Sequence, residues 1–380
     1  MNEFDWPVDP SFGSSQKNRG LPIGEGIPLT VIRNGEMLVV AAADAVGRYL
    51  FTGDRLWKRK YDGSVTHCAT TDTAVLAAVE HGAVGDVRRS GLLARLAMAS
   101  GAESWTKDLG PALVTADLAI SEDRALVGDA RGRVRCLDLR DGTTAWTSPY
   151  LWGPVQAVDV VAPDTVALAV SDSKRLAGLD ILTGQMAWQH KFLGGAQVLR
   201  TYAAKALVHR LESKSATAAL FEVDLESGTL LQAVGLKAVE GTPLLTGDDQ
   251  IIVRRRAQIA KTDFTRKTLW TATLPDLPMN DGALSGQTLL HVLSNATAVA
   301  INTENGSTLW RRQLPGPPVG ARPRPSGAQV CLLQDGTVLE INPAQGEISW
   351  STKVLRANSI EIAGNVVCVS EDRQLYVVRT

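Results

Sequence analysis

The sequence lacks any long apolar run. None of its 380 residues belongs to a segment that approaches the roughly 18 consecutive apolar residues of a membrane helix. The first ten residues carry acidic side chains and prolines, whereas a secretory signal carries basic residues followed by an apolar stretch. We therefore expect a cytoplasmic protein with no membrane partner.

An excess of charge of either sign is also missing. Lys and Arg together number 39, Asp and Glu number 40, and the formal net charge is −1. Proteins that bind nucleic acids or anionic membranes in general carry a strongly positive surface. The near-neutral balance excludes general nucleic-acid binding, although local basic clusters remain.

Cysteine is scarce, and its spacing carries no metal or redox motif. The four cysteines, Cys68, Cys136, Cys331 and Cys368, stand singly, and three of them lie in apolar strand-like runs. The absence of C-x-x-C and C-x-x-C-H excludes a zinc ribbon and a haem attachment site. We expect these thiols to behave as small buried apolar groups.

Catalytic patterns are absent as well. The five histidines show no H-x-x-x-H or H-E-x-x-H spacing, and the chain has no G-x-S-x-G sequence. His67 beside Cys68, with His81 in the same repeat, is a weak candidate for a metal site, and Asp248 next to Asp249 is another. A structural role is favoured at both places, so we predict no catalytic residue, no metal ligand and no cofactor.

What the sequence does contain is a repeat built on glycine and tryptophan. Tryptophan follows glycine by four residues in six places, and two further copies are degenerate: Gln232 replaces the tryptophan after Gly228, and Arg266 replaces the glycine before Trp270. Consecutive copies lie 38 to 48 residues apart. The tryptophans that we assign to the repeat are Trp57, Trp105, Trp146, Trp188, Trp270, Trp310 and Trp350.

An Asp or Asn precedes the glycine by four residues in five of the copies, as Asp138 does for Gly142. Its side chain can accept hydrogen bonds from nearby backbone amides, and the glycine supplies a positive φ, so the pair predicts a hairpin turn. Short alternating runs such as Val134–Asp138 predict strands before it. Four strands in a unit of about 40 to 45 residues are typical of a β-propeller blade.

The segments 178–188, 300–310 and 340–350, which read GLDILTGQMAW, AINTENGSTLW and EINPAQGEISW, resemble the PQQ-type propeller repeat. The resemblance extends over nearly the whole chain and implies an all-β propeller of four-stranded PQQ-like blades. It does not specify one function, because the repeat is shared by quinoprotein alcohol dehydrogenases, by an outer-membrane assembly lipoprotein and by propellers without a cofactor. A quinoprotein would also need a calcium site and an adjacent cysteine pair, which this sequence does not display.

The number of blades depends on the chain ends. Three strand-like runs follow Trp350, and Trp6 in residues 3–9 resembles a fourth strand that lacks its first three. Pairing the two ends avoids an open sheet edge. We therefore predict a single domain over 1–380 with nine blades and eight as the alternative: a closing strand at 3–9, a loop or flexible arm at 10–28, and repeats at 29–380.

The functional prediction follows from the scaffold, because many loops of a rigid propeller converge on one surface where they can bind partners. We predict a non-catalytic protein-binding scaffold in a bacterial cytoplasmic multiprotein system, with an ATPase or another effector as the partner that the resemblance suggests. The alternatives are a sensor for a small ligand or metal and, last, a quinone-dependent oxidoreductase. Local positive charge and an aromatic residue beside Tyr150 give the candidate partner-binding residues, which are Arg88, Arg89, Arg254, Arg255, Arg256 and Trp152.

Overall fold

The computed structural model contains strands and connecting turns. It describes residues 21–22, 28–35, 37–42, 44–52, 54–82, 90–111, 114–115, 118–121, 123–161, 166–171, 175–192, 195–202, 205–211, 217–237, 240–246, 250–263, 267–371 and 374–379. No helix occurs in these residues, and hence none long and apolar enough to cross a bilayer.

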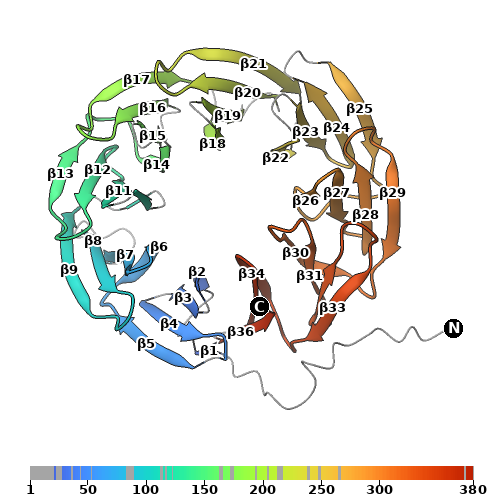
Figure 1. The fold of residues 1–380 in the computed structure, drawn as a ribbon, viewed down its shortest axis with the longest axis horizontal. Coiled ribbons are helices and arrows are strands. Elements are labelled where there is room, and N and C mark those ends of the chain that lie inside the picture. Colours follow the sequence, from blue (N-terminus) through green and yellow to red (C-terminus); the bar gives the residue numbers. More distant parts are fainter. Residues whose placement is uncertain are drawn as a thin grey trace. The chain divides into compact units, whose positions relative to one another are not determined.

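Within the described residues, 36 strands form nine four-stranded sheets (Figure 1). Eight of the sheets are built from four consecutive strands, and the ninth combines β34, β35 and β36 with β1. The chain is therefore a nine-bladed β-propeller, which confirms the predicted fold class and the blade count and excludes the alternative of eight.

The chain divides into two compact units, one of residues 1–38, 49–55 and 239–380 and one of residues 39–48 and 56–238. Whether they behave as the single domain expected from the sequence stays a prediction. The residues of one sheet are divided between the units, and that sheet consists of β2 (Pro28–Asn34), β3 (Met37–Ala42), β4 (Ala45–Leu50) and β5 (Arg55–Lys60).

The second unit, 39–48 and 56–238, holds four complete sheets. In chain order they are β6 (Ser64–Thr70), β7 (Ala74–His81), β8 (Ser90–Ala97) and β9 (Glu103–Gly110); β10 (Ala119–Ser121), β11 (Arg124–Gly128), β12 (Val134–Asp138) and β13 (Thr144–Thr147); β14 (Val155–Val161), β15 (Val166–Ser171), β16 (Arg175–Asp180) and β17 (Met186–Lys191); and β18 (Gly195–Tyr202), β19 (Lys205–Leu211), β20 (Thr217–Asp224) and β21 (Leu230–Lys237).

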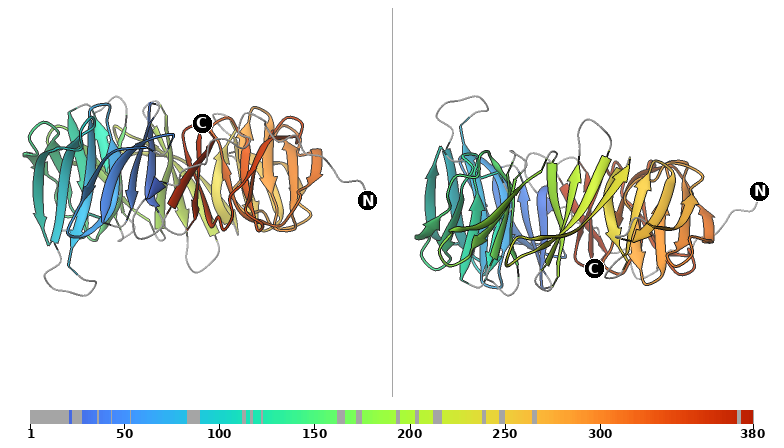
Figure 2. Two further views of the ribbon diagram at one scale, coloured as in Figure 1. Left: turned by 90° about the horizontal axis from the view of Figure 1, so that it is seen from below. Right: turned by 90° about the horizontal axis from the view of Figure 1, so that it is seen from above.

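The first unit also holds four complete sheets. They are β22 (Glu240–Leu245), β23 (Gln250–Arg255), β24 (Gln258–Asp263) and β25 (Thr268–Thr273); β26 (Ala283–Ser285), β27 (Thr288–Val292), β28 (Thr297–Asn302) and β29 (Thr308–Gln313); β30 (Pro318–Pro323), β31 (Gln329–Leu333), β32 (Thr337–Ile341) and β33 (Ile348–Lys353); and β34 (Ser359–Ala363), β35 (Val366–Glu371), β36 (Gln374–Arg379) and β1 (Leu21–Pro22). In each unit the turns lie at the two ends of the strands (Figure 2).

The predicted turn between the third and fourth strands forms as its residues dictate. Asp180 is typical: its Oδ1 accepts hydrogen bonds from the amides of Leu182 (3.0 Å) and Thr183 (2.7 Å), and these bonds lower the pKa of its carboxyl, with the Thr183 amide as the main cause. Gly184 closes the turn with φ +69° and donates its amide hydrogen to the Asp180 carbonyl. The Asp–Gly pair therefore sets the hairpin that brings the fourth strand back.

The repeat tryptophans lie on the fourth strands, at the outer side of each unit in Figure 1, and each of six rings packs on the turn glycine of the next sheet. A Cβ added to that glycine would stand 2.3 to 2.8 Å from the ring. The indole nitrogen donates to the carbonyl three residues before the glycine: Trp57 to Met98 (2.9 Å), Trp105 to Leu139 (2.9 Å), Trp146 to Ile181 (2.8 Å), Trp188 to Leu225 (2.8 Å), Trp270 to Thr303 (3.0 Å) and Trp310 to Pro343 (3.0 Å).

The core consists of apolar layers between consecutive sheets of a unit. In the second unit Leu126 and Cys136 pack with Ala167 and Leu179 of the following sheet, and all four are buried. In the first unit Cys331 occupies an equivalent layer. Burial raises the pKa of Cys68 and of Cys368 to about 12, so these thiols stay protonated at neutral pH.

The closing strand differs from the expectation. β1 pairs with β36, with Leu21 opposite Leu375 and Pro22 opposite Gln374, and so completes the last sheet from within the stretch 10–28 that the sequence assigns to a loop. The expected strand at 3–9 lies outside the described residues. A two-residue strand has no alternation to detect, and Pro22 is tolerated because it lies at a sheet edge.

Candidate functional site

The three consecutive arginines do not form a uniform basic patch. They lie at the end of β23 and in its turn to β24, where Arg256 is exposed with φ +55° while Arg254 and Arg255 are half-buried. The Arg254 side chain is only 19% exposed and its Nη2 lies 3.3 Å from Asp281 Oδ1. Whether these residues bind a partner stays a prediction, but the position of Arg254 also serves the fold.

A buried polar cluster lies beside Arg254. His291 on β27 is 1% exposed, and burial, with the nearby Arg254 charge, lowers the pKa of its imidazole to about 4. Asn280 donates to Gln329 Oε1 (3.0 Å), and Gln329 is fully buried. The neutral imidazole and these paired amides belong to the packing between sheets, and no reacting group is offered to solvent.

The other candidate residues from the sequence provide little evidence for a functional site. Arg88, Arg89, Asp248 and Asp249 lie outside the described residues. His67 and His81 are half-buried: His67 lies in the middle of β6, opposite Ala78 of β7, and His81 is the last residue of β7. Among the described residues no group of three or more His, Cys, Asp or Glu side chains could hold a metal ion.

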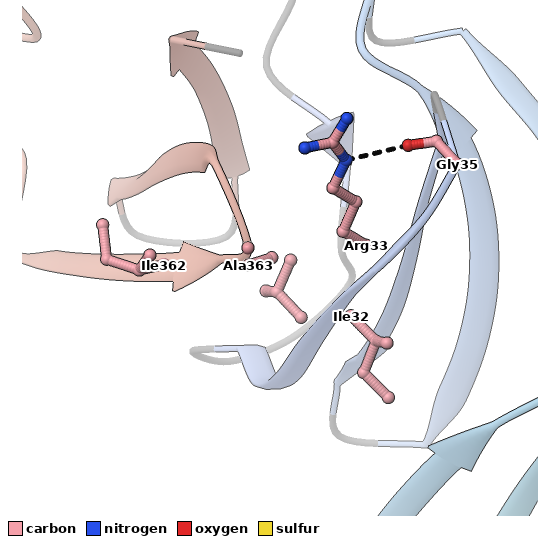
Figure 3. A pocket seen from close by; sticks show the side chains of 7 residues that line it. Ile32, Arg33, Gly35, Ile362 and Ala363 are labelled. Atoms are coloured by element: carbon pink, nitrogen blue, oxygen red, sulfur yellow. Dashed lines mark hydrogen bonds between the residues drawn. The ribbon is translucent and has the colours of Figure 1, made fainter. Parts of the chain in front are cut away.

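A shallow cavity of about 500 Å³ lies in the first unit between β2 and β34 (Figure 3). Its lining consists of Val31, Ile32, Arg33, Gly35, Ile362, Ala363 and Gly364. The single charged side chain, Arg33, donates from Nε to the Gly35 carbonyl at 2.9 Å. The seven residues supply no nucleophile, general base or metal ligand, so this cavity is a poor candidate for chemistry.

The best candidate is an exposed aromatic loop in the second unit, between β13 and β14. Tyr150 and Trp152 are 51% and 42% exposed, and their ring centroids lie 6.3 Å apart. Leu151 between them is buried, which anchors the loop, and its amide donates to the Gly132 carbonyl at 2.7 Å. Both large rings are thus exposed to solvent, while the buried Leu151 fixes the loop that carries them.

The backbone of this loop is strained. Trp152 adopts φ +59°, a left-handed conformation that a bulky residue rarely takes without a functional or packing reason. The neighbouring hairpin, from β11 to β12, packs tightly under it, because a Cβ on Gly132 would stand 2.5 Å from the Gly153 carbonyl oxygen and 2.9 Å from the Tyr150 ring. The positions of the two rings are therefore set by the fold.

One arginine contacts a ring of this loop, and two more lie in the hairpin that packs against it. The Arg175 guanidinium, at the start of β16, lies over the Trp152 ring with its Cζ 4.1 Å from the centroid. Arg131 and Arg133 flank Gly132 in the hairpin, and both are exposed. We call the five residues Arg131, Arg133, Tyr150, Trp152 and Arg175 the aromatic–arginine surface. Sequence reasoning selected Trp152 and Tyr150 but missed the arginines, which lie 17 or more residues away along the chain, in the sheets before and after the loop.

The residue types in this arrangement suit recognition better than catalysis. Aromatic rings and arginines are enriched among the residues that dominate binding energy at protein interfaces. A guanidinium does not act as a base at neutral pH, and a tyrosine ring and an indole alone do not make a catalytic pair.

A family model described as "Outer membrane protein assembly factor BamB" matches the chain over residues 88–242 and 216–380. Among curated proteins, none matches the sequence.

Several solved structures resemble the chain. BamB from Moraxella catarrhalis shares 16% identity, with 82% of this chain and 95% of that chain covered and a TM-score of 0.55. The computationally designed protein Ika8 shares 14% identity, with 96% of this chain and 100% of that chain covered and a TM-score of 0.60. The quinohemoprotein alcohol dehydrogenase ADHIIG from Pseudomonas putida HK5 shares 12% identity, with 84% of this chain and 70% of that chain covered and a TM-score of 0.51. At such identities the likeness shows the fold alone.

The described residues do not fit a calcium–quinone centre such as the resemblance to quinoproteins implies. Their carboxylates form no cluster that could hold the metal, and the four cysteines of the chain are never adjacent. We derive no reaction through such a group.

Proposed function

Since the chain belongs to the family of the outer membrane protein assembly factor BamB, we propose that it is a non-catalytic scaffold that binds another protein through the aromatic–arginine surface. The observation that carries the proposal is the pair Tyr150 and Trp152, held exposed by the buried Leu151. Large rings whose positions are fixed before binding lose little conformational entropy when a partner covers them.

The same surface distinguishes binding from catalysis. Its five side chains are three guanidinium groups, one phenol and one indole, and none of them is an imidazole, a thiol or a carboxylate. A sensor for a small ligand would need an enclosed pocket with convergent polar groups. The surface described above is open, which favours a macromolecule as the ligand.

The cellular setting stays part of the proposal. We keep the prediction of a bacterial cytoplasmic assembly in which the partner is an ATPase or another effector, although the name of the matched family refers to outer membrane assembly. Cell fractionation of the native host separates the two: recovery with the outer membrane would overturn the cytoplasmic assignment and leave the scaffold proposal intact.

The experiment for the binding surface is crosslinking and affinity capture of the tagged full chain from its native host. A variant with Tyr150→Ala and Trp152→Ala is compared with a matched control, Leu269→Ala and Leu309→Ala, which removes two exposed leucines in the first unit. We expect the control to keep the captured protein and the aromatic variant to lose it. Equal capture by both variants would contradict the proposed surface.

A further inference from the structure

The charges around Tyr150 and Trp152 indicate what kind of partner this surface fits, an inference that rests on the proposed function. We propose that the segment which docks here is an acidic peptide of the partner protein. Its carboxylates pair with Arg131 and Arg133, and an apolar or aromatic side chain of the segment lies against Trp152.

Arg131 and Arg133 present unneutralised charge. Both are exposed, and among the described residues neither forms an ion pair or a side-chain hydrogen bond. Their backbone amides donate to Asp129 Oδ1 at 2.9 and 3.0 Å, which fixes the hairpin that carries them. The backbone that carries the two side chains is thus fixed, and their guanidinium groups can donate hydrogen bonds to carboxylates.

The carboxylate of Asp129 does not cancel these charges. It is 1% exposed, its Oδ1 accepts the two backbone amides, and its Oδ2 lies 3.5 Å from Nε of Arg135. Asp129 therefore forms its ion pair with Arg135, whose side chain is 21% exposed. The charge of Arg131 and Arg133 remains to attract a ligand.

Arg175 adds a third positive charge beside the rings. Its Nη1 donates to the neutral Gln189 Oε1 at 3.0 Å, so this contact orients the guanidinium without neutralising it. Because the guanidinium lies on Trp152, the ring is covered on that side by a cation–π contact. A carboxylate placed near Arg175 would also be close to the aromatic pair.

The contrast between this local positive charge and the near-neutral net charge of the chain favours an acidic peptide over a nucleic acid as the ligand. Three arginines gather within a chain whose formal net charge is −1. Nucleic acids are held by longer basic tracks that contact several phosphates, whereas a short acidic segment needs only a few cations and an apolar anchor. A local patch in a near-neutral chain matches the second case.

The test uses the full chain and defined probes. Fluorescein-labelled decapeptides of alternating Glu and Tyr, of alternating Gln and Tyr, and of alternating Lys and Tyr are compared with a labelled oligouridylate by fluorescence anisotropy at low and high ionic strength. Variant Arg131→Glu with Arg133→Glu is set against a matched reversal of two exposed arginines in the first unit, Arg311→Glu with Arg356→Glu.

We expect the Glu–Tyr peptide to bind best, with affinity that falls as ionic strength rises. Replacement of Glu by Gln, or reversal of Arg131 and Arg133, should weaken binding by about tenfold or more, whereas the control reversal should change it by less than about twofold. Equal binding of the Gln–Tyr peptide would overturn the acidic partner. Tighter binding of oligouridylate would assign the surface to RNA, and binding of no probe would also overturn the inference.

The two proposals fail separately. If the protein captured from the native host is lost with Trp152→Ala but kept when Arg131 and Arg133 are reversed, the scaffold function stands and the acidic segment is excluded. If Trp152→Ala also has no effect on capture, the surface itself is excluded. Circular dichroism of each variant shows whether a loss of binding reflects loss of the fold.

Discussion

Gly346 lies against the face of Trp310, since a Cβ at Gly346 would stand 2.7 Å from Cε3 of the ring. The ring belongs to β29 and the glycine to the turn before β33, so this contact links two consecutive sheets of the first unit. Gly346 also adopts φ +71°. One glycine therefore meets two requirements, a left-handed turn and room for the neighbouring indole.

We predict that Gly346→Ala destabilises the protein through both requirements. A left-handed residue with a Cβ costs about 1 to 2 kcal/mol, and displacement of the ring adds to that. Urea unfolding measures the total. Gly286→Ala is the matched control, because Gly286 has φ +54° but nothing within 4 Å of an added Cβ. If the two variants lose the same stability, the contact with Trp310 has no energetic role.

Trp310→Ala should lower the free energy of unfolding by about 3 to 5 kcal/mol, because it removes the ring from Gly346 and the hydrogen bond to the Pro343 carbonyl. Trp310→Phe should cost less, since it keeps a ring and loses the donor. Trp152→Ala, which removes an exposed indole, is the control. Unchanged thermal unfolding of Trp310→Ala would contradict the role of the repeat tryptophans.

The lowered pKa of the buried His291 predicts that the protein loses stability in mild acid. Burial and the Arg254 charge lower its folded-state pKa to about 4, whereas the unfolded value is near 6.5. The unfolded chain therefore binds this proton first, and stability falls as pH drops from about 6.5 toward 4, by up to about 3 kcal/mol. His291→Leu should flatten the dependence in that window. Parallel profiles for wild type and variant, measured by urea unfolding across the window, would show that His291 is not responsible.

The blade pattern was predictable because it depends on local chemistry that repeats. Asp180 and Gly184 define the same turn wherever their spacing recurs, and a tryptophan four residues later falls on the fourth strand. β1 was not predictable in this way, because Leu21 and Pro22 are too few to show alternation and carry no repeat tryptophan. The sequence pattern pointed instead to Trp6, which lies outside the described residues.

The candidate site was predictable only in part. Tyr150 and Trp152 stood out as aromatic residues between prolines, which is a local feature. Arg131 and Arg175 are separated from them by a strand or more, and they meet because the hairpin of one sheet and the start of β16 lie beside the same loop. The pairing of Arg254 with Asp281 is equally non-local, so a run of three arginines suggested more free charge than the structure leaves.

Arg254→Glu is therefore expected to destabilise the fold and cannot serve as a simple charge reversal. It would place a second carboxylate beside Asp281 in a half-buried position, and we expect a loss of about 2 kcal/mol, less than for a fully buried pair because the site is partly solvated. The exposed Arg311→Glu should change stability by about 0.5 kcal/mol or less. Equal unfolding midpoints in urea would show that the ion pair with Asp281 is unimportant.

The aromatic–arginine surface should depend on Gly132, which has φ +74° and supports Tyr150 and Gly153 from below. Gly132→Ala would push its Cβ against the Gly153 carbonyl and the Tyr150 ring, so the two rings and the flanking arginines would move apart. We expect the affinity for the Glu–Tyr peptide to fall by about tenfold, since the site relies on groups held in place before binding.

Gly336→Ala is the matched control: Gly336 occupies the corresponding hairpin of the sheet β30–β33, with φ +84° and an added Cβ 2.3 Å from the Val354 carbonyl. Both variants should lose similar stability because they carry the same strain, but only Gly132→Ala should lose the peptide. If both bind it as the wild type does, or both lose it equally, the local support of Tyr150 by Gly132 does not determine recognition.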